Sequence, residues 1–264
     1  MSCGAGPIDI SLAPDKNSGV DPSQISSKTI LGKIIRLPFR FIPSRTVVPI
    51  LRGPARGKSW ISDCSTNGFW LGYWELDNQW QFANSLRPGD VVYDIGAHAG
   101  LFTLISSARV GPSGHVYSFE PFPRNLQNLR RHIELNRLEN CTVVGVAVAA
   151  ARETRWFVPT AHDSAGYLSE SGEIRVETIS LDEFLYGNRG IRPPKAMKVN
   201  AEGAELEILT GAERLLSEHS PLIFLSTHSH ELNDKCARLL SAAGYQLEQI
   251  STDKVWATKG TGFR

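Results

Sequence analysis

The alternation of short apolar strands with helical segments from Val91 onward is the feature that most constrains the fold. Seven strand-like segments occur there: 90–96, 115–121, 142–149, 196–200, 221–227, 245–250 and 254–258. Helical patterns lie between most of them, at 99–109, 123–136, 204–217 and in the stretch that ends at Ala243. Such alternation predicts an α/β fold, a doubly wound and mostly parallel seven-stranded sheet with helices on both faces. Strand-like runs at 154–158 and 173–179 are expected at the rim of this sheet.

The chain before this domain (91–264) reads as an N-terminal extension in two parts. Residues 1–27 are rich in Gly, Ser, Pro and Asp without periodicity, which is typical of a flexible tail. Residues 28–90 are predicted to form an N-terminal arm and an aromatic lid segment. A turn signal at 65–68 predicts a hairpin that leads into a helix. The aromatic side chains beyond it are expected either to cover a substrate or to pack in the core: Trp70, Tyr73 and Trp74.

Charge and composition exclude several classes of protein. The chain has 28 Lys+Arg and 27 Asp+Glu, a net charge of +1, whereas a protein that coats nucleic acid needs a basic surplus. It contains no run of about 18 apolar residues, so a membrane span is not expected. Met1–Leu12 lacks the pattern of a secretory signal, and the four cysteines form no C-x-x-C pair. We therefore expect a cytoplasmic protein without nucleic-acid or membrane partners; its oligomeric state stays open, a homodimer included.

A glycine turn at the end of the first strand predicts a cofactor site. Asp94 precedes a G-x-x-x-G turn, Gly96 to Gly100, that enters a helix, and parallel sheets bind ligands beyond such strand ends. A nicotinamide site has G-x-G-x-x-G and a helix N-terminus for pyrophosphate, which Asp94 would repel. The same carboxylate would attract the sulfonium and ammonium of S-adenosylmethionine. Glu120, at the end of the second strand, can accept hydrogen bonds from the ribose hydroxyls of either cofactor.

Several motifs in fixed order make the chain resemble a known family. They are VVYDIGAHAGLFTL, SFEPFPRNLQNLRRHIELN, VETISLDEFL and MKVNAEGAELEILTGA, and with the segment from Leu51 they resemble the FkbM family of S-adenosylmethionine-dependent methyltransferases. The resemblance implies a class I methyltransferase (Rossmann-like) fold and S-adenosylmethionine as cofactor. It also implies O-methylation of a hydroxyl on a small molecule, a sugar or a secondary metabolite.

The resemblance also implies a set of cofactor-binding residues. They are Asp94, Gly96, His98 and Gly100 at the methionine end, Glu120 at the ribose, and Pro121 and Phe122 beside the adenine. The acid that follows the aromatic segment, Glu75, is a further candidate for the cofactor's ammonium group.

The fourth strand departs from the family pattern. The family has K-[IV]-D-x-E-G where this chain has Lys198-Val199-Asn200-Ala201-Glu202-Gly203. The amide of Asn200 can orient a hydroxyl but cannot act as a base, and no metal site is expected. Without the acid at position 200, one alternative to an active transferase is a cofactor-binding regulatory module that has lost turnover. A second alternative, from another class, is a nicotinamide oxidoreductase.

Two further residues complete the set of catalytic candidates with Asn200. His228 follows the fifth strand and is expected to be the general base, because an imidazole can accept a proton near neutral pH. Glu202 either contacts the cofactor or substrate or is a first-turn helix acid that suits the helix dipole. The alternative for His228 is a helix cap or a solvated side chain. Glu205 and Glu207 are expected to be solvated.

Overall fold

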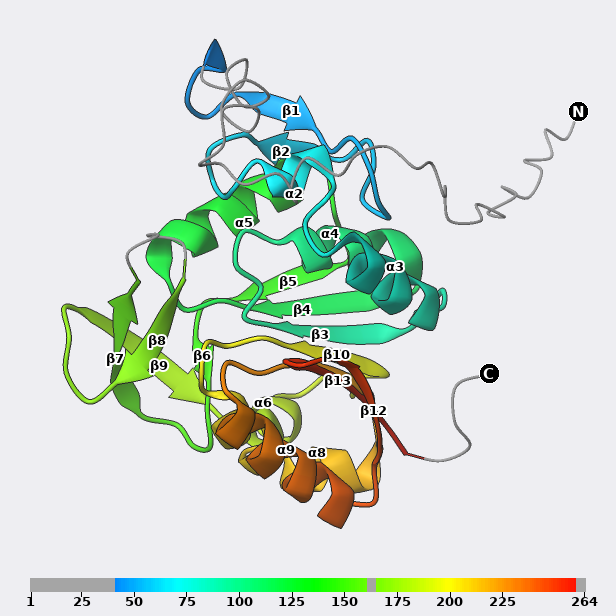
Figure 1. The fold of residues 1–264 in the computed structure, drawn as a ribbon, viewed down its shortest axis with the longest axis vertical. Coiled ribbons are helices and arrows are strands. Elements are labelled where there is room, and N and C mark those ends of the chain that lie inside the picture. The colour runs from blue at the N-terminus through cyan, green and yellow to red at the C-terminus, as the bar shows by residue number, and fades with distance from the viewer. Residues whose placement is uncertain (1–40, 161–164, 260–264) are drawn as a thin grey trace, which may run out of the picture. The chain divides into compact units, whose positions relative to one another are not determined.

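A seven-stranded sheet forms the centre of the fold, in a computed structural model that describes residues 41–160 and 165–259 (Figure 1). The predicted tail at 1–27 and the start of the predicted arm, 28–40, lie outside the described residues. The strands in spatial order are β12 (Gln246–Ser251), β13 (Lys254–Thr258), β11 (Leu222–Ser226), β10 (Ala196–Val199), β3 (Val91–Ile95), β4 (His115–Phe119) and β5 (Cys141–Val144). All neighbours are parallel except β13, which is antiparallel to β11 and β12. The predicted α/β fold is confirmed.

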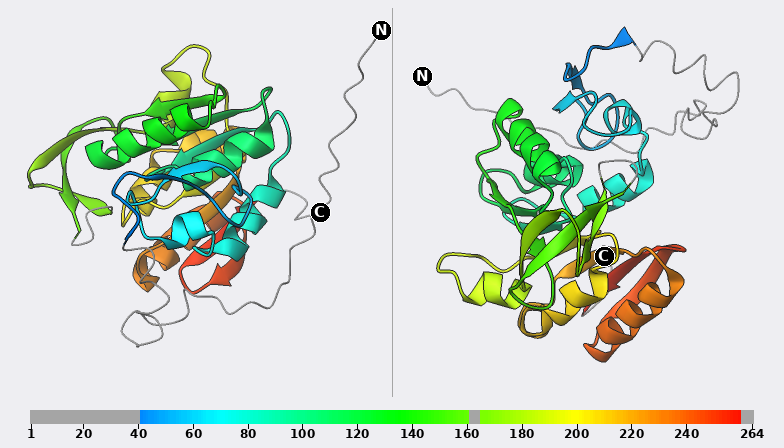
Figure 2. Two further views of the ribbon diagram at one scale, coloured as in Figure 1. Left: turned by 90° about the horizontal axis from the view of Figure 1, so that it is seen from above. Right: turned by 90° about the vertical axis from the view of Figure 1, so that its left-hand side faces the viewer.

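Helices cover both faces of this sheet (Figure 1, Figure 2). One layer holds α3 (Leu76–Ser85), α4 (Leu101–Val110) and α5 (Pro123–Leu135), and the other holds α6 (Leu181–Tyr186), α7 (Glu205–Thr210), α8 (Glu213–Glu218) and α9 (His230–Ala242). The side chains of β3 show why two layers are needed. Tyr93 and Ile95 belong to the apolar cluster that includes α6 to α9, whereas Val92 packs with Phe82 and Phe102 of the first layer. A strand buried on both faces reads as a continuous apolar run, as this one does.

A second sheet lies beyond β5 and forms the predicted rim. Its order is β6 (Ala147–Val148), β9 (Ile174–Ile179), β7 (Thr154–Pro159) and β8 (Gly166–Ser169). The runs expected at 154–158 and 173–179 are β7 and β9, whereas β8 was not predicted. The predicted strand at 142–149 is divided, because β5 ends at Val144 and β6 pairs with β9. The predicted helix at 204–217 is also divided, near Gly211, where an added Cβ would lie 2.3 Å from the carbonyl oxygen of Ala149.

Before α3, the described part of the N-terminal extension contains two short strands and one helical turn. β1 (Val47–Pro49) runs antiparallel to β2 (Ser59–Ile61), and α2 (Gly68–Leu71) follows. The turn signal at 65–68 therefore precedes α2 and does not close a hairpin; the hairpin connection is 50–58. Asn136, at the end of α5, holds the first residue of β2 with two hydrogen bonds. Its Oδ1 accepts from the Ser59 N–H at 2.8 Å, and its Nδ2 donates to the Ser59 oxygen at 2.9 Å.

His132 on α5 joins this extension to the glycine turn. The imidazole is fully buried and stacked on Trp60 with 4.1 Å between ring centroids. Its Nε2 accepts from the Ile61 N–H at 2.9 Å, and its Nδ1 donates to the Ala99 oxygen at 2.7 Å. Burial lowers the pKa of His132 to about 4, so the ring is neutral and its two nitrogens have fixed roles. The extension is thereby held against the strand–helix turn that begins at Gly96.

Candidate active site

A cavity of about 330 Å³ lies at the carboxyl ends of β3, β4 and β10. Several other parts of the chain line it as well: the α2 region with Ser65, Thr66, Phe69 and Trp74, the starts of α4 and α5 with Leu101, Phe102 and Asn125, and the rim sheet with Ala147, Val148, Phe157, Gly166 and Leu168. Of the three aromatic residues proposed as a lid, Trp74 lines the cavity. It stacks on Phe69, with ring centroids 4.4 Å apart, and sequence reasoning did not single out Phe69.

The glycine turn forms the side of the cavity next to β3. Gly96 has a φ of +70°, and a Cβ there would lie 1.9 Å from the carbonyl oxygen of Asn200, so only glycine fits between β3 and β10. The amides of Gly96 and Ala97 both donate to the oxygen of Phe119, at 3.1 and 2.9 Å. His98 also has a positive φ, 53°, and lines the cavity with Gly96. Gly100, at the N-terminus of α4, is not a lining residue but completes the turn.

Glu120 places a buried carboxylate on the cavity at the end of β4. It is 4% exposed, and its oxygens accept from the amides of His98 at 2.7 Å and Phe122 at 2.9 Å. Burial raises the pKa of Glu120 to about 7, against the opposing effect of these two hydrogen bonds. Each carboxylate oxygen has two lone pairs, so the group can still accept hydrogen bonds from a ligand.

Asp94 lies beneath the glycine turn, away from the cavity surface. It is fully buried and 3.5 Å from the Nζ of Lys198 through Oδ1, and its Oδ2 accepts from the Thr103 hydroxyl at 2.7 Å. Lys198 in turn donates to the carbonyl oxygen of Gly96 at 2.7 Å and lines the cavity. Asp94 thus supports the turn through a buried ion pair. A direct contact with the cofactor stays a prediction. Lys198 was not proposed as a site residue, although a lysine inside an apolar strand signals a buried partner.

Two other predicted cofactor residues turn toward protein partners. Phe122 is buried and stacks on Phe157, with ring centroids 5.1 Å apart, while Pro121 lines the cavity. Glu75 is not among the lining residues. Its Oε1 lies 3.1 Å from the Nζ of Lys254 on β13. Contact between Glu75 and the cofactor's ammonium stays a prediction that this ion pair does not favour.

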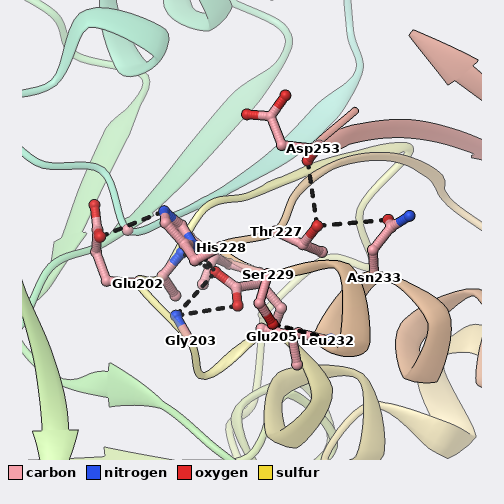
Figure 3. Close-up of polar contacts among 12 residues, drawn as sticks. Glu202, Gly203, Glu205, Thr227, His228, Ser229, Leu232, Asn233 and Asp253 are labelled. Atoms are coloured by element: carbon pink, nitrogen blue, oxygen red, sulfur yellow. Dashed lines mark hydrogen bonds and ion pairs between the residues drawn. The ribbon is translucent and has the colours of Figure 1, made fainter. Parts of the chain in front are cut away.

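The predicted catalytic residues gather at the end of β10. Asn200 and Glu202 both line the cavity, and in the described part of the chain the Oδ1 of Asn200 is buried without a hydrogen-bond partner. His228 lies behind Glu202, with Nε2 3.4 Å from Glu202 Oε2 and Nδ1 3.0 Å from Glu205 Oε1 (Figure 3). Glu205 is fully buried, contrary to the expectation that it is solvated.

The two carboxylates determine the charge of His228. They raise the pKa of its imidazole to about 10, and they outweigh the opposite effect of burial. In return, the hydrogen bond with His228 lowers the pKa of Glu202. His228 is therefore a cation at neutral pH with both ring nitrogens directed at carboxylates, a state that has no lone pair for a proton. The general-base role expected of His228 stays untested, and this geometry does not favour it. Glu202 therefore presents an ionised carboxylate to the cavity.

Comparison with known proteins decides the family. The family model described as the methyltransferase FkbM domain matches residues 94–247, more than half of the chain. The chain belongs to the FkbM methyltransferase family. The family resemblance drawn from the sequence is confirmed, the cofactor of the FkbM-family chain is S-adenosylmethionine, and the nicotinamide alternative is set aside.

Relatives of this FkbM-family chain include two curated enzymes and a solved structure. The chain is 29% identical to the 31-O-demethyl-FK506 methyltransferase FkbM of Streptomyces tacrolimicus, over 48% of this chain and 61% of the relative. It is 25% identical to the hexuronic acid methyltransferase AglP of Haloferax volcanii, over 60% and 64%. The chain thus spans less than two thirds of either relative. The structure of a methyltransferase FkbM from Methylobacillus flagellatus KT matches with a TM-score of 0.45 at 20% identity, over 73% of this chain and 53% of that one.

The site residues of this FkbM-family chain fit the cofactor's chemistry. The cavity presents the carboxylates of Glu120 and Glu202, which suit ribose hydroxyls and positive charge and would repel a phosphate. The turn at Gly96 leaves no room for a side chain, so backbone can approach a ligand there. Among residues 41–160 and 165–259, no group of three or more His, Cys, Asp or Glu side chains is placed to hold a metal ion. Within the same ranges, no helix has the length and apolar character needed to cross a bilayer.

Proposed function

We propose that the chain transfers a methyl group from S-adenosylmethionine to a hydroxyl oxygen of a small molecule, a sugar or a secondary metabolite. The proposal depends on two side chains that line the cavity close together in sequence, at the end of β10. In the described residues the amide oxygen of Asn200 has no hydrogen-bond partner, and the carboxylate of Glu202 is ionised. An acceptor hydroxyl needs an orienting group and an acceptor for its proton, and these two side chains supply both. The printed names of two relatives, which describe a 31-O-demethyl-FK506 methyltransferase and a hexuronic acid methyltransferase, agree with such acceptors.

The residues that hold the cofactor in this proposal are those of the glycine turn and the end of β4. Gly96 and His98 would contact the methionine end, with Gly100 and Asp94 fixing the turn, and Glu120 would accept from the ribose hydroxyls. Pro121 would border the adenine, and Phe122 would support that side by its stack on Phe157. When bound, the cofactor supplies a methyl group on a positively charged sulfur.

The proton of the acceptor hydroxyl would pass to Glu202. The hydroxyl oxygen loses its proton as its bond to the methyl group forms, and a protonated ether is a far stronger acid than a carboxylic acid. A carboxylate whose pKa is lowered by His228 is therefore basic enough for this transfer. Asn200 would donate or accept one hydrogen bond to fix the hydroxyl's direction, because alignment of the reacting atoms recovers much of the barrier. The mostly apolar lining, with Phe69 and Trp74, would exclude water.

Mass spectrometry of acceptors incubated with S-adenosylmethionine tests this proposal. A panel of hydroxylated sugars and secondary metabolites, each paired with its deoxy and amino analogues, should show the gain of one methyl group on the hydroxyl form alone. Glu202→Gln should lower turnover by about 10²–10⁴-fold, the usual worth of proton-transfer help. Methylation of the amino analogues alone would replace the oxygen acceptor by nitrogen. Binding of the cofactor without transfer to any acceptor would favour the regulatory module.

A further inference from the structure

The carboxylate of Glu205 is fully buried at the first position of α7 and makes four polar contacts (Figure 3). Its Oε1 accepts from the Ala201 amide at 3.0 Å, the Gly203 amide lies 3.1 Å from Oε2 and 3.3 Å from Oε1, and the Nδ1 of His228 donates at 3.0 Å. A charge taken out of water is tolerated only when it is paired and hydrogen-bonded, so this arrangement is specific and costly to break. Glu205 does not line the cavity, so it cannot touch an acceptor there.

These contacts determine the conformation of the turn that carries Glu202. Glu202 has a φ of 50°, a region that a residue with a Cβ adopts only when its surroundings impose it. The two amides that Glu205 binds flank Glu202 on either side, and Gly203 continues the turn with a φ of +106°. The buried carboxylate thus fixes the backbone on both sides of the residue that faces the cavity.

His228 is itself held in place from both directions. The amide of Thr227 donates to the carbonyl oxygen of Asp253 at 2.8 Å, and its hydroxyl donates to the same oxygen at 3.3 Å (Figure 3). The hydroxyl of Ser229 caps α9 by accepting from the Leu232 amide at 3.1 Å. The imidazole between these anchors spans Glu205 and Glu202 with its two nitrogens. Its position therefore decides where the Glu202 carboxylate lies.

We propose that Glu205 is a positioning residue of the methyl-transfer site: it holds the turn at Ala201–Gly203 and the His228 cation, which together direct the Glu202 carboxylate into the cavity. This inference rests on the proposed function for the role of Glu202. The contacts that Glu205 makes with the turn and with His228 can be tested without methyl transfer. Sequence reasoning assigned Glu205 to solvent because it is one of several acids near a helix start, and only the fold brings it beside His228.

The charged and titratable groups around His228 lead to a dependence on pH. From α7 and the preceding turn, Glu205 and Glu202 face the ring; from α9, Cys236 faces Glu205, and burial raises the pKa of its thiol to about 12. The β12–β13 turn contributes Asp253, which is paired with Lys254 at 3.1 Å. Lys198 and His98 act on Glu202 from the cavity side. Glu202 and Glu205 together keep His228 charged, so turnover should fall as pH rises through about 10, when the ring loses its proton and its hold on Glu202.

Glu205→Gln is the central variant, because it keeps the shape of the side chain but removes the charge. It also replaces one of the two accepting oxygens by an NH2 group, which cannot accept from the Ala201 or Gly203 amide. We expect kcat to fall by up to about 10²-fold, the cost of misplacing a reacting group, with little change in KM for S-adenosylmethionine. The decline of activity with pH should move down from about 10, toward the ordinary imidazole value of 6.5. His228→Gln, at a more exposed position that is less prone to misfold, should lower kcat similarly and abolish that decline. The double variant should lose less activity than the product of the two single losses, because the two side chains share the contact between Glu205 and His228. Glu213→Gln, an exposed glutamate on α8, is the matched control and should behave as the unaltered protein.

Measurements that do not need an acceptor separate this inference from the proposed function. The ring signals of His228 followed by NMR should titrate near 10 in the unaltered protein and lower in Glu205→Gln. Amide exchange at Ala201 and Gly203 should quicken in that variant. These results would support the positioning role even if no acceptor were methylated, an outcome that would refute the proposed function alone. Unchanged titration and exchange in a folded Glu205→Gln, or unchanged kcat and pH profile in both single variants, would overturn the inference.

Discussion

Gly96→Ala tests whether the close approach of β3 to β10 builds the cofactor turn. The new Cβ would lie 1.9 Å from the oxygen and 2.9 Å from the carbon of the Asn200 carbonyl, at a φ of +70°. Positive φ alone costs an alanine about 1–2 kcal/mol. The Cβ would overlap with the backbone of Asn200, which cannot rotate away as a side chain could, so the turn must move. It then loses the bonds of Gly96 and Ala97 to the Phe119 oxygen and the bond from Lys198, each worth about 1 kcal/mol. The free energy of unfolding should therefore fall by about 3–5 kcal/mol.

Gly190→Ala is the matched control, since Gly190 also has a positive φ, +85°, but a Cβ there meets nothing within 4 Å. It should cost only the backbone strain of about 1–2 kcal/mol. Thermal unfolding with and without S-adenosylmethionine measures both effects. A ligand at a hundredfold excess over its Kd stabilises the folded state by about 2.7 kcal/mol, which Gly190→Ala should retain and Gly96→Ala should lose. If Gly96→Ala were destabilised no more than Gly190→Ala and kept the cofactor's stabilisation, the reasoning would be refuted.

Three further predictions concern a cofactor residue, a structural histidine and the departure from the family pattern. The affinity for S-adenosylmethionine should fall about tenfold for each pH unit below about 7, as Glu120 becomes protonated and stops accepting from the ribose, and calorimetric titration of Glu120→Gln should lack that dependence. His132→Leu should lower the free energy of unfolding by about 2–4 kcal/mol, because the Ile61 amide and the Ala99 carbonyl lose their partner. The folded pKa of His132 is lowered to about 4, so the contribution of this residue to stability is present above pH 6.5 and is lost as pH falls toward 4. Urea unfolding of the variant should therefore depend less on acid pH than that of the unaltered protein. Asn200→Asp should keep or raise methyl transfer, and a chelator should change neither rate; a large loss on substitution would show that the pocket is built around the amide.

Local patterns predicted the parts of the site that are contiguous in sequence. The turn at Gly96 and the acid at Glu120 were found because a strand, a glycine and a helix follow one another within a few residues. Glu205 and its contact with His228 were missed, because the separation of 23 residues between them carries no periodic signal. The same holds for Lys198, whose partner Asp94 lies on the neighbouring strand of the sheet but far earlier in the sequence.

The prediction of strand and helix boundaries from the sequence has a similar limit. The strand expected at 142–149 has one continuous apolar pattern, and only the pairing of Ala147 with Thr178 moves its second half into the rim sheet. The helix expected at 204–217 is interrupted because Gly211 packs against the backbone of Ala149. Periodicity describes which side of a segment is buried, whereas these breaks depend on what it is buried against.

The pairing of β3 with β10 has a consequence for the synthesis of the chain. Lys198 donates to the oxygen of Ile95, a residue 103 positions earlier. At about 5–20 residues per second, a ribosome takes about 5–20 s to add that stretch. During this interval the nascent glycine turn lacks β10 beside it, and Asp94 lacks its lysine. Contacts of such high sequence separation also slow folding, because the chain between them must be ordered first. S-adenosylmethionine can therefore stabilise only a chain that has been synthesised beyond β10, and fragments that end before Ala196 should not bind it.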